Sequence, residues 1–329
     1  MTKKLYLSNS QINTFTDCNR KWHIDKVQRI RPTYLSSPLY FGTLIDDTLE
    51  HYLINKDGKH LETFYKCLNN FEVNGSAKVL PKDLLALRIN VGDLDDKLIN
   101  QSDVDDYCSS KDLESVQVKE FLDYCKSKRK RKSPLDMTEQ SIFNFMGYKS
   151  LEAKGLLMIE KLIEWVDEHV EEVISTQKKI DITNGNGDKF IGYLDFVVRL
   201  KSGKTVLIDL KTSSDPNKYY PEDAANTSRQ LGIYSQEEKI KDVAYLVVDK
   251  KIRKREPRVR LKYVEGIITE EWLDEVFDEI EKVTEQIKEK LPLGESAFEK
   301  NLDSCHNYGN CQYRGLCEKG SMSGLEKIK

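Results

Sequence analysis

The sequence predicts a mixed α/β (α+β) fold in which helices flank a mixed central sheet. The first observation is that apolar residues recur at helical spacing in the N-terminal part, whereas between residues 173 and 267 most of them follow a period of two. The second is composition. Of 329 residues, 39% are hydrophobic and 33% are charged, which gives a charge-rich globular chain a sizeable core. The length fits two compact units or one elaborated domain.

The elements predicted up to residue 170 are helices. Residues 8–26 place apolar side chains at helical spacing after a serine that can cap the helix. The segment 41–53 carries one apolar stripe and is predicted to be an amphipathic helix. Between 60 and 148 the pattern weakens, which we interpret as a helical insertion or cap. A further helix is predicted over 151–170.

Strands are predicted next, because apolar runs rich in β-branched residues alternate with turn residues. They span 173–182, 190–200, 205–212, 243–248 and 259–267. A helix is predicted over 224–239, and a long charged helix runs from Thr269 until Pro292 ends it. The tail from 293 onward is predicted to be irregular.

These elements predict four parts: N-terminal helices at 1–58, a helical insertion or cap at 59–150, a core at 151–268, and a C-terminal helix with a cysteine-bearing tail at 269–329. The net charge is only −3, so nucleic-acid binding has to depend on local patches. No apolar run approaches the roughly 20 residues of a membrane helix. The N-terminus is too short in its apolar part for a signal peptide. We therefore expect a soluble cytoplasmic protein without membrane contact.

Two predicted strands carry Asp195, Asp209 and Lys211. Side chains alternate along a strand, so Asp209 and Lys211 share a face. A two-residue connection would put Asp195 on the opposite face, whereas a three-residue connection aligns it with Asp209 or Lys211. Gly203 favours such a loop, and we predict a connection of odd length.

This arrangement suits metal-assisted chemistry on phosphodiesters. Two carboxylates on adjacent strands are hard ligands for Mg²⁺ or Mn²⁺, which lower the pKa of a bound water. A nearby lysine orients that water or stabilises charge developing on phosphorus. The alternative is a cross-face ion pair between Asp209 and Lys211 on an exposed strand. Both aspartates lie in apolar runs, where an unpaired charge is costly, and this favours a site.

Gln230 and Tyr234 lie four residues apart on a predicted helix. They can hold a phosphate or support metal ligands, and the alternative is a packed helix face. In this order the motifs resemble the PD-(D/E)XK nuclease superfamily, and within it the RecB-type exonuclease branch. GYLDFVV with Asp195 matches the first acidic motif, and Asp209 with Lys211 matches the acid-x-lysine motif. The Gln-x-x-x-Tyr motif matches the helical pair, and the resemblance implies a restriction-endonuclease-like fold with these five residues as catalytic.

The family also has a metal-ligand histidine on a helix that opens with glycine. FGTLIDD places Asp46 at that position, with Asp47 as a rival. This departure keeps an oxygen ligand but changes the charge of the site, and similar versions occur among phage-type members. A second departure is Gln177, near the place of the family's acidic residue on the preceding strand. The resemblance implies Mg²⁺ or Mn²⁺ held by Asp46, Asp195, Asp209 and the Leu210 carbonyl.

Three of the seven cysteines are evenly spaced in the tail, at Cys305, Cys311 and Cys317. They resemble iron–sulfur members of the RecB-like branch, including AddB and the CRISPR-associated adaptation nucleases. Those proteins use one further cysteine near the N-terminus, and Cys18 in SQINTFTDCNRKW matches it. The resemblance implies a structural [4Fe–4S] cluster on these four residues, although the spacing departs from the C-x₂-C-x₅-C form of some members.

Zinc is the alternative ligand of the tail, with His306 assisting, although zinc sites usually show tighter cysteine pairs. The alternative for Cys18 is a buried position on its helix. The remaining cysteines follow no spacing pattern, and we interpret them as free or buried thiols. They are Cys67, Cys108 and Cys125.

Two basic runs are candidate DNA contacts. Lys126–Lys132 contains six basic residues in seven, and Lys250–Lys262 contains eight in thirteen. The second run suggests a basic arm along a phosphate backbone, and the alternative for both is a solvated surface. No base-reading element is recognisable, so little sequence specificity is expected. The candidate contacts are Lys126, Lys128, Arg129, Lys130, Arg131, Lys132, Lys250, Lys251, Arg253, Lys254 and Arg255.

The resemblance implies a metal-dependent deoxyribonuclease, an exonuclease acting on DNA ends or single strands. Its setting would be recombination, repair or phage DNA replication, with DNA and recombination or replication proteins as partners. A viral gene would place it in the host cytoplasm. The alternatives are a non-catalytic DNA-end-binding or assembly subunit with a nuclease-like fold, and a structure-specific endonuclease. The Asp–Asp–Lys set argues against the first alternative, whereas the replaced histidine leaves it open.

Overall fold

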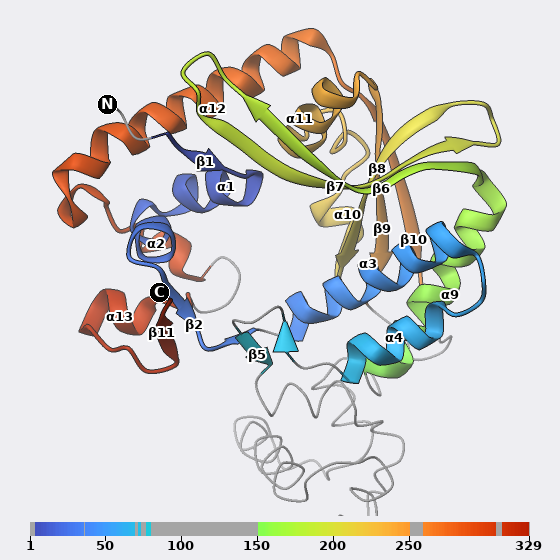
Figure 1. The fold of residues 1–329 in the computed structure, drawn as a ribbon, viewed down its shortest axis with the longest axis horizontal. Helices are drawn as coiled ribbons and strands as arrows, with labels where there is room; N and C mark the ends of the chain where they lie inside the picture. Colours follow the sequence, from blue (N-terminus) through green and yellow to red (C-terminus); the bar gives the residue numbers. More distant parts are fainter. Residues whose placement is uncertain are drawn as a thin grey trace, which may run out of the picture.

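A mixed sheet of six strands lies at the centre of the protein (Figure 1). The computed structural model describes residues 4–35, 37–69, 72–73, 77–79, 151–250, 259–306 and 311–328. The strand order is β1-β7-β8-β9-β10, and β6 also pairs with β7. The bounds are β1 Tyr6–Leu7, β6 Val170–Thr183, β7 Lys189–Leu200, β8 Thr205–Ser213, β9 Asp242–Asp249 and β10 Leu261–Ile267. Two pairs, β1–β7 and β8–β9, are parallel and the others antiparallel, so the predicted mixed central sheet is confirmed.

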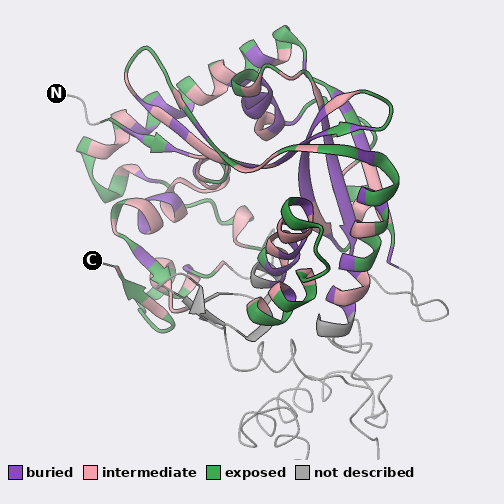
Figure 2. Ribbon diagram, turned by 45° about the vertical axis from the view of Figure 1, so that its right-hand side comes forward, coloured by how far each residue is buried: buried purple, intermediate pink, exposed green. Residues whose placement is uncertain are grey.

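Helices cover both faces of the sheet, as the fold class predicts. One face packs against α3 (Ser37–Asn55) and α9 (Leu151–His169). The other face packs against α1 (Asn9–Asp17), α11 (Arg229–Glu238) and α12 (Glu270–Lys290). Figure 2 shows the central strands β8 and β9 as largely buried, whereas β6 is mostly exposed or intermediate.

Alternation along the strands divides the apolar side chains between two cores. Val198 and Ile208 enter the core with α3 and α9, whereas Val197 and Leu207 enter the core with α11 and α12. This pattern is the one that the sequence shows, and all five predicted strands are present. The long helix also begins as predicted, because Thr269 accepts a hydrogen bond from the Trp272 amide at 3.2 Å.

The prediction of a single helix over residues 8–26 is wrong. The chain forms α1, breaks at Cys18, and continues as α2 (Asn19–Trp22) and a π-helical turn (His23–Val27). Cys18 has extended backbone, and the Arg20 amide donates to the Glu299 carbonyl at 3.0 Å. The C-terminal tail therefore takes over hydrogen bonds that a continuous helix would make internally, and no local pattern contains that information.

Other short elements also escape prediction, because two or three residues carry no readable periodicity. The tail is more ordered than predicted: β11 pairs with β2 near the N-terminal helices.

No helix within the described ranges is both long and apolar enough to cross a membrane. The four-part division stays a prediction, and residues 80–150 of the predicted insertion lie outside the described residues. The remaining bounds are β2 Ile30–Pro32, β3 Tyr34–Leu35, α4 His60–Asn69, β4 Glu72–Val73, β5 Ala77–Val79, α10 Pro216–Tyr219, α13 Arg314–Lys319, β11 Leu325–Lys327 and 3₁₀ turns at Leu291–Leu293, Glu295–Ala297 and Asp303–His306.

Candidate functional site

The β7–β8 hairpin aligns two of the predicted site residues. Phe196 lies opposite Ile208 and Arg199 opposite Thr205, and the Leu200 amide donates to the Lys204 carbonyl at 2.8 Å. The same register places Asp195 opposite Asp209. It leaves a three-residue connection, residues 201–203, in which Gly203 has a φ of +85°. The predicted odd-length connection is therefore confirmed.

Asp209 is fully buried and is surrounded by polar partners. Its Oδ1 accepts a hydrogen bond from Gln230 Nε2 at 2.8 Å, and its Oδ2 forms an ion pair with Lys211 Nζ. Gln230 Nε2 also lies 3.2 Å from the Tyr234 hydroxyl. Ser228 caps α11 by accepting from the Leu231 amide, which fixes the start of the helix that presents this pair. Gln230 therefore contacts the aspartate directly, and Tyr234 is linked to it through Gln230.

Asp195 faces the next strand. Its Oδ2 accepts a hydrogen bond from the Leu210 amide at 2.7 Å. The structure therefore links Asp195 to the N–H of Leu210, whereas a metal-ligand role of the Leu210 carbonyl stays a prediction. Burial, and then the charges of Asp209 and Asp46, raise the pKa of Asp195 well above its usual range. Burial alone would lower the pKa of Lys211, but Asp209 and Asp195 together outweigh it and raise that pKa.

Helix α3 brings a third carboxylate to the two strands. Asp46 Oδ2 accepts a hydrogen bond from Gln177 Nε2 of β6 at 2.9 Å. Burial, and then the nearby charges of Asp47 and Asp209, raise the pKa of Asp46 to about 6. Asp47 points elsewhere, since its Oδ2 lies 3.6 Å from Cys67 Sγ. The structure thus brings Asp46, and not its rival, toward Asp195 and Asp209.

Two residues near this site were not anticipated. Glu50 follows Asp46 by one helical turn on α3, and its Oε1 accepts from Thr176 Oγ1 at 3.3 Å. Its i, i+4 spacing from Asp46 was a readable signal. Gly192 is the second: a β-carbon there would lie 2.7 Å from Cε1 of Tyr234, so glycine lets the tyrosine ring approach β7.

We call Asp46, Asp195, Asp209 and Lys211 the carboxylate–lysine cluster. Its oxygen donors suit a hard divalent cation, and the mutual repulsion of the three carboxylates is what such a cation relieves. Protein donors already face at least one oxygen of each carboxylate. Within the described ranges, no group of three or more histidine, cysteine or acidic side chains is arranged to hold a metal ion. The fit to a divalent metal thus rests on the oxygen donors and on the repulsion between them.

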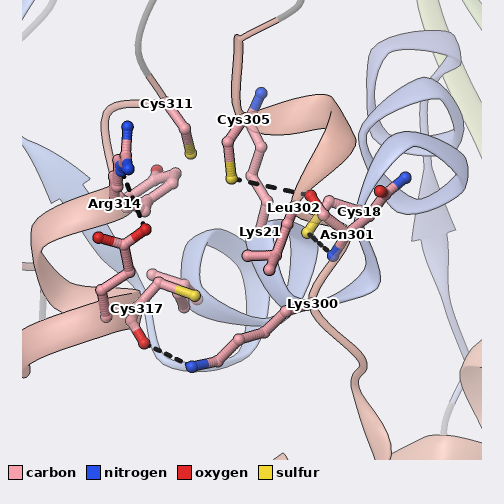
Figure 3. A pocket seen from close by; sticks show the side chains of 12 residues that line it. Cys18, Lys21, Lys300, Asn301, Leu302, Cys305, Cys311, Arg314 and Cys317 are labelled. Atoms are coloured by element: carbon pink, nitrogen blue, oxygen red, sulfur yellow. Dashed lines mark hydrogen bonds and ion pairs between the residues drawn. The ribbon is translucent and has the colours of Figure 1, made fainter.

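The four predicted cluster cysteines line one small pocket, which we call the cysteine pocket (Figure 3). The Asn301 amide lies 3.5 Å from Cys18 Sγ, and Cys305 Sγ lies 3.7 Å from the Asn301 carbonyl. Burial, and then the other three thiols, raise the pKa of Cys305. His306 instead has its Nε2 3.2 Å from Arg314 Nη1. The members of the pocket that the sequence named are Cys18, Cys305, Cys311 and Cys317, all free and partly exposed thiols.

Of the predicted DNA contacts, Lys250 lies among the described residues. It follows β9, its amide donates to the Ser213 carbonyl at 2.7 Å, and burial lowers the pKa of its side chain. Lys250 therefore lies beside the C-terminal end of β8, the strand that carries Asp209 and Lys211. The other candidates lie outside the described residues: Lys126, Lys128, Arg129, Lys130, Arg131, Lys132, Lys251, Arg253, Lys254 and Arg255.

Comparison with curated proteins, solved structures and protein families gives three results. No curated protein matches the chain. The crystal structure of SSO0001 aligns over 41% of this chain and 59% of its own, with 17% sequence identity and a TM-score of 0.27. The alignment thus spans less than two thirds of that protein. The model of the PD-(D/E)XK nuclease superfamily matches residues 6–74 and 58–318. The mixed sheet flanked by helices agrees with the restriction-endonuclease-like fold, and the chain belongs to the PD-(D/E)XK nuclease superfamily.

Proposed function

We propose that the protein is a metal-dependent DNA nuclease whose active site is the carboxylate–lysine cluster. The observation that carries this proposal is the convergence of a helix and two strands on three mutually repelling carboxylates and one lysine. Mg²⁺ or Mn²⁺, when bound, supplies charge stabilisation at the phosphate and a water of lowered pKa. The proposed ligands are Asp46, Asp195, Asp209 and the Leu210 carbonyl.

Lys211 is proposed to act as a fixed cation. The two aspartates raise its pKa, so the ammonium group stays protonated at neutral pH. A protonated lysine cannot accept a proton from water, but it stabilises negative charge that develops on a phosphate oxygen. Its ion pair with Asp209 holds it beside the carboxylates before substrate arrives.

Gln230 and Tyr234 are proposed to orient the site. Gln230 Nε2 donates to Asp209 Oδ1, which fixes the carboxylate plane. Burial, and then the charge of Asp209, raise the pKa of Tyr234 to about 12, so its hydroxyl keeps its proton. Because that hydroxyl accepts from Gln230, it helps to hold the Gln230 amide beside Asp209.

Within the superfamily, we assign the protein to the RecB-like exonuclease branch, acting on DNA ends or single strands in recombination, repair or phage replication. The order of the motifs, from Asp46 through Asp195 and Lys211 to Tyr234, supports this assignment. The sequence has no recognisable base-reading element, which agrees with cleavage independent of sequence.

The cysteine pocket is proposed to hold a [4Fe–4S] cluster with a structural role. Four thiols suit such a cluster, and Lys21, Lys300 and Arg314 line the same pocket, where they would balance the negative charge of thiolates (Figure 3). The alternative is zinc. Iron and acid-labile sulfide measured on anaerobically purified protein distinguish the two, and a stoichiometric zinc content without iron would contradict the cluster.

The nuclease proposal is tested with anaerobically purified protein, end-labelled linear DNA and Mg²⁺ or Mn²⁺. We expect short products from the wild type and none from Asp209→Ala. An Asp242→Asn control, at the start of β9, should cleave like the wild type. Cutting of closed circular single strands would exclude a strict exonuclease. DNA binding without cleavage under either metal would instead favour an end-binding subunit.

A further inference from the structure

A strained backbone position lies beside the carboxylate–lysine cluster. Gln177 has a φ of +44°, in the left-handed region that residues with a β-carbon rarely adopt. In the ladder between β6 and β7, Thr176 is opposite Phe196 and Lys178 is opposite Leu194, so Gln177 faces Asp195. The register is the same on both sides of this position, so the departure is confined to the backbone of Gln177 itself.

The side chain of Gln177 contacts a proposed metal ligand. Gln177 Nε2 donates to Asp46 Oδ2 at 2.9 Å, and the preceding Thr176 Oγ1 donates to Glu50 Oε1 at 3.3 Å. Asp46 and Glu50 lie one turn apart on α3. Two consecutive residues of β6 therefore hold two acidic residues on the same side of one helix.

We infer that Gln177 is a positioning residue that holds Asp46 Oδ2 and thereby directs Oδ1 toward the metal. This inference rests on the proposed function. An amide suits the task because it donates a hydrogen bond without adding charge. An ionised carboxylate at position 177 would instead repel Asp46 and Asp195, which already repel each other.

Thr176 supplies a matched comparison. It belongs to the same strand and bonds to the same helix, but its partner Glu50 is not among the proposed ligands. If the two residues merely joined β6 to α3, replacing either of them should change the Mn²⁺ affinity to the same extent. A role in orienting a ligand makes Gln177 matter for metal affinity and leaves Thr176 with a small effect.

The test measures Mn²⁺ affinity of the full-length protein by calorimetry, without DNA. Gln177→Leu and Gln177→Gly should each bind Mn²⁺ about tenfold more weakly, the lower range for loss of an outer-shell partner. Thr176→Val should stay within about twofold of the wild type. Glycine accepts a positive φ without strain, so Gln177→Gly should melt no lower than the wild type. Unchanged Mn²⁺ affinity in the glycine variant, or an equal loss in Thr176→Val, overturns the inference.

A double substitution shows whether Gln177 acts through Asp46. Asp46→Asn should weaken Mn²⁺ binding, and adding Gln177→Gly should weaken it no further, because both changes remove the same oriented carboxylate. Losses that add independently overturn the inference. A wild type that binds no Mn²⁺ overturns the proposed metal function together with it. Wild-type binding that Gln177→Gly leaves intact overturns the inference alone.

Discussion

The carboxylate–lysine cluster and the cysteine pocket are organised in opposite ways. In the first, neighbouring strands joined by a three-residue connection place Asp195 opposite Asp209, and protein donors engage both carboxylates. In the second, one thiol comes from residue 18 and three from 305–317, and hydrogen bonds such as that from the Arg20 amide to the Glu299 carbonyl at 3.0 Å join the segments. The sheet therefore prearranges the first region, whereas the second joins segments far apart in the sequence, which the proposed cluster would cross-link. Loss of the proposed divalent metal from the first region should reduce DNA cleavage. Loss of the proposed iron–sulfur cluster from the second should reduce the stability of the protein.

Replacing Lys211 by methionine should have the largest effect on this comparison. It removes the fixed cation and keeps most of the aliphatic stem, so single-turnover DNA cleavage should fall by about 10³-fold. The free energy of unfolding should also fall by about 3 kcal/mol, because Asp209 loses its buried partner. Lys204→Met, directly before β8, is the control and should leave cleavage unchanged. A Lys211→Met enzyme within tenfold of the wild type contradicts the assigned role.

Removing a cysteine of the pocket should mainly affect stability. Cys18→Ser or Cys311→Ser should lower iron content and cost about 5 kcal/mol of unfolding free energy, by analogy with the closure of a long loop by a cross-link. Chemical denaturation under anaerobic conditions measures this loss. Cys67→Ser is the control, since Cys67 contacts Asp47 and not the pocket. Full iron content in Cys18→Ser would exclude that residue as a ligand.

Crowding Tyr234 should have an intermediate effect. A β-carbon at Gly192 would meet the Tyr234 ring at 2.7 Å, so Gly192→Ala must displace a buried tyrosine. We expect a cost of about 1–3 kcal/mol in stability, typical of overpacking. The tyrosine hydroxyl should also move away from Gln230, and kcat should fall by about tenfold. Gly185→Ala meets no atom within 4 Å and should change neither quantity. Equal melting temperatures of both variants would show that the site accommodates the methyl group.

The smallest expected effect separates Asp46 from its neighbour. Asp47→Asn should keep Mn²⁺ affinity and cleavage within about twofold of the wild type, because its carboxylate faces Cys67. Asp46→Asn should lose both. The reverse result would assign the ligand to Asp47 and would move the metal toward α4.

Local patterns predicted the part of the site that depends on local geometry. Period-two alternation and Gly203 were sufficient to predict that Asp195 and Asp209 share a face. The choice between Asp46 and Asp47 was not readable, because adjacent helix positions differ only in how α3 is rotated against the sheet. The break at Cys18 was missed for a related reason: the Glu299 carbonyl that receives the Arg20 amide lies far along the sequence.

The pairing of β2 with β11 also orders events during biosynthesis. Asn301 and Cys18 are separated by 283 residues, and β11 ends at Lys327. The strands that carry Asp195 and Asp209 leave the ribosome earlier and can assemble while the final segment is still being translated. The contacts around Cys18 can form only after that segment has emerged. A cellular system that inserts the proposed iron–sulfur cluster would therefore act after the strands of the carboxylate–lysine cluster have been translated.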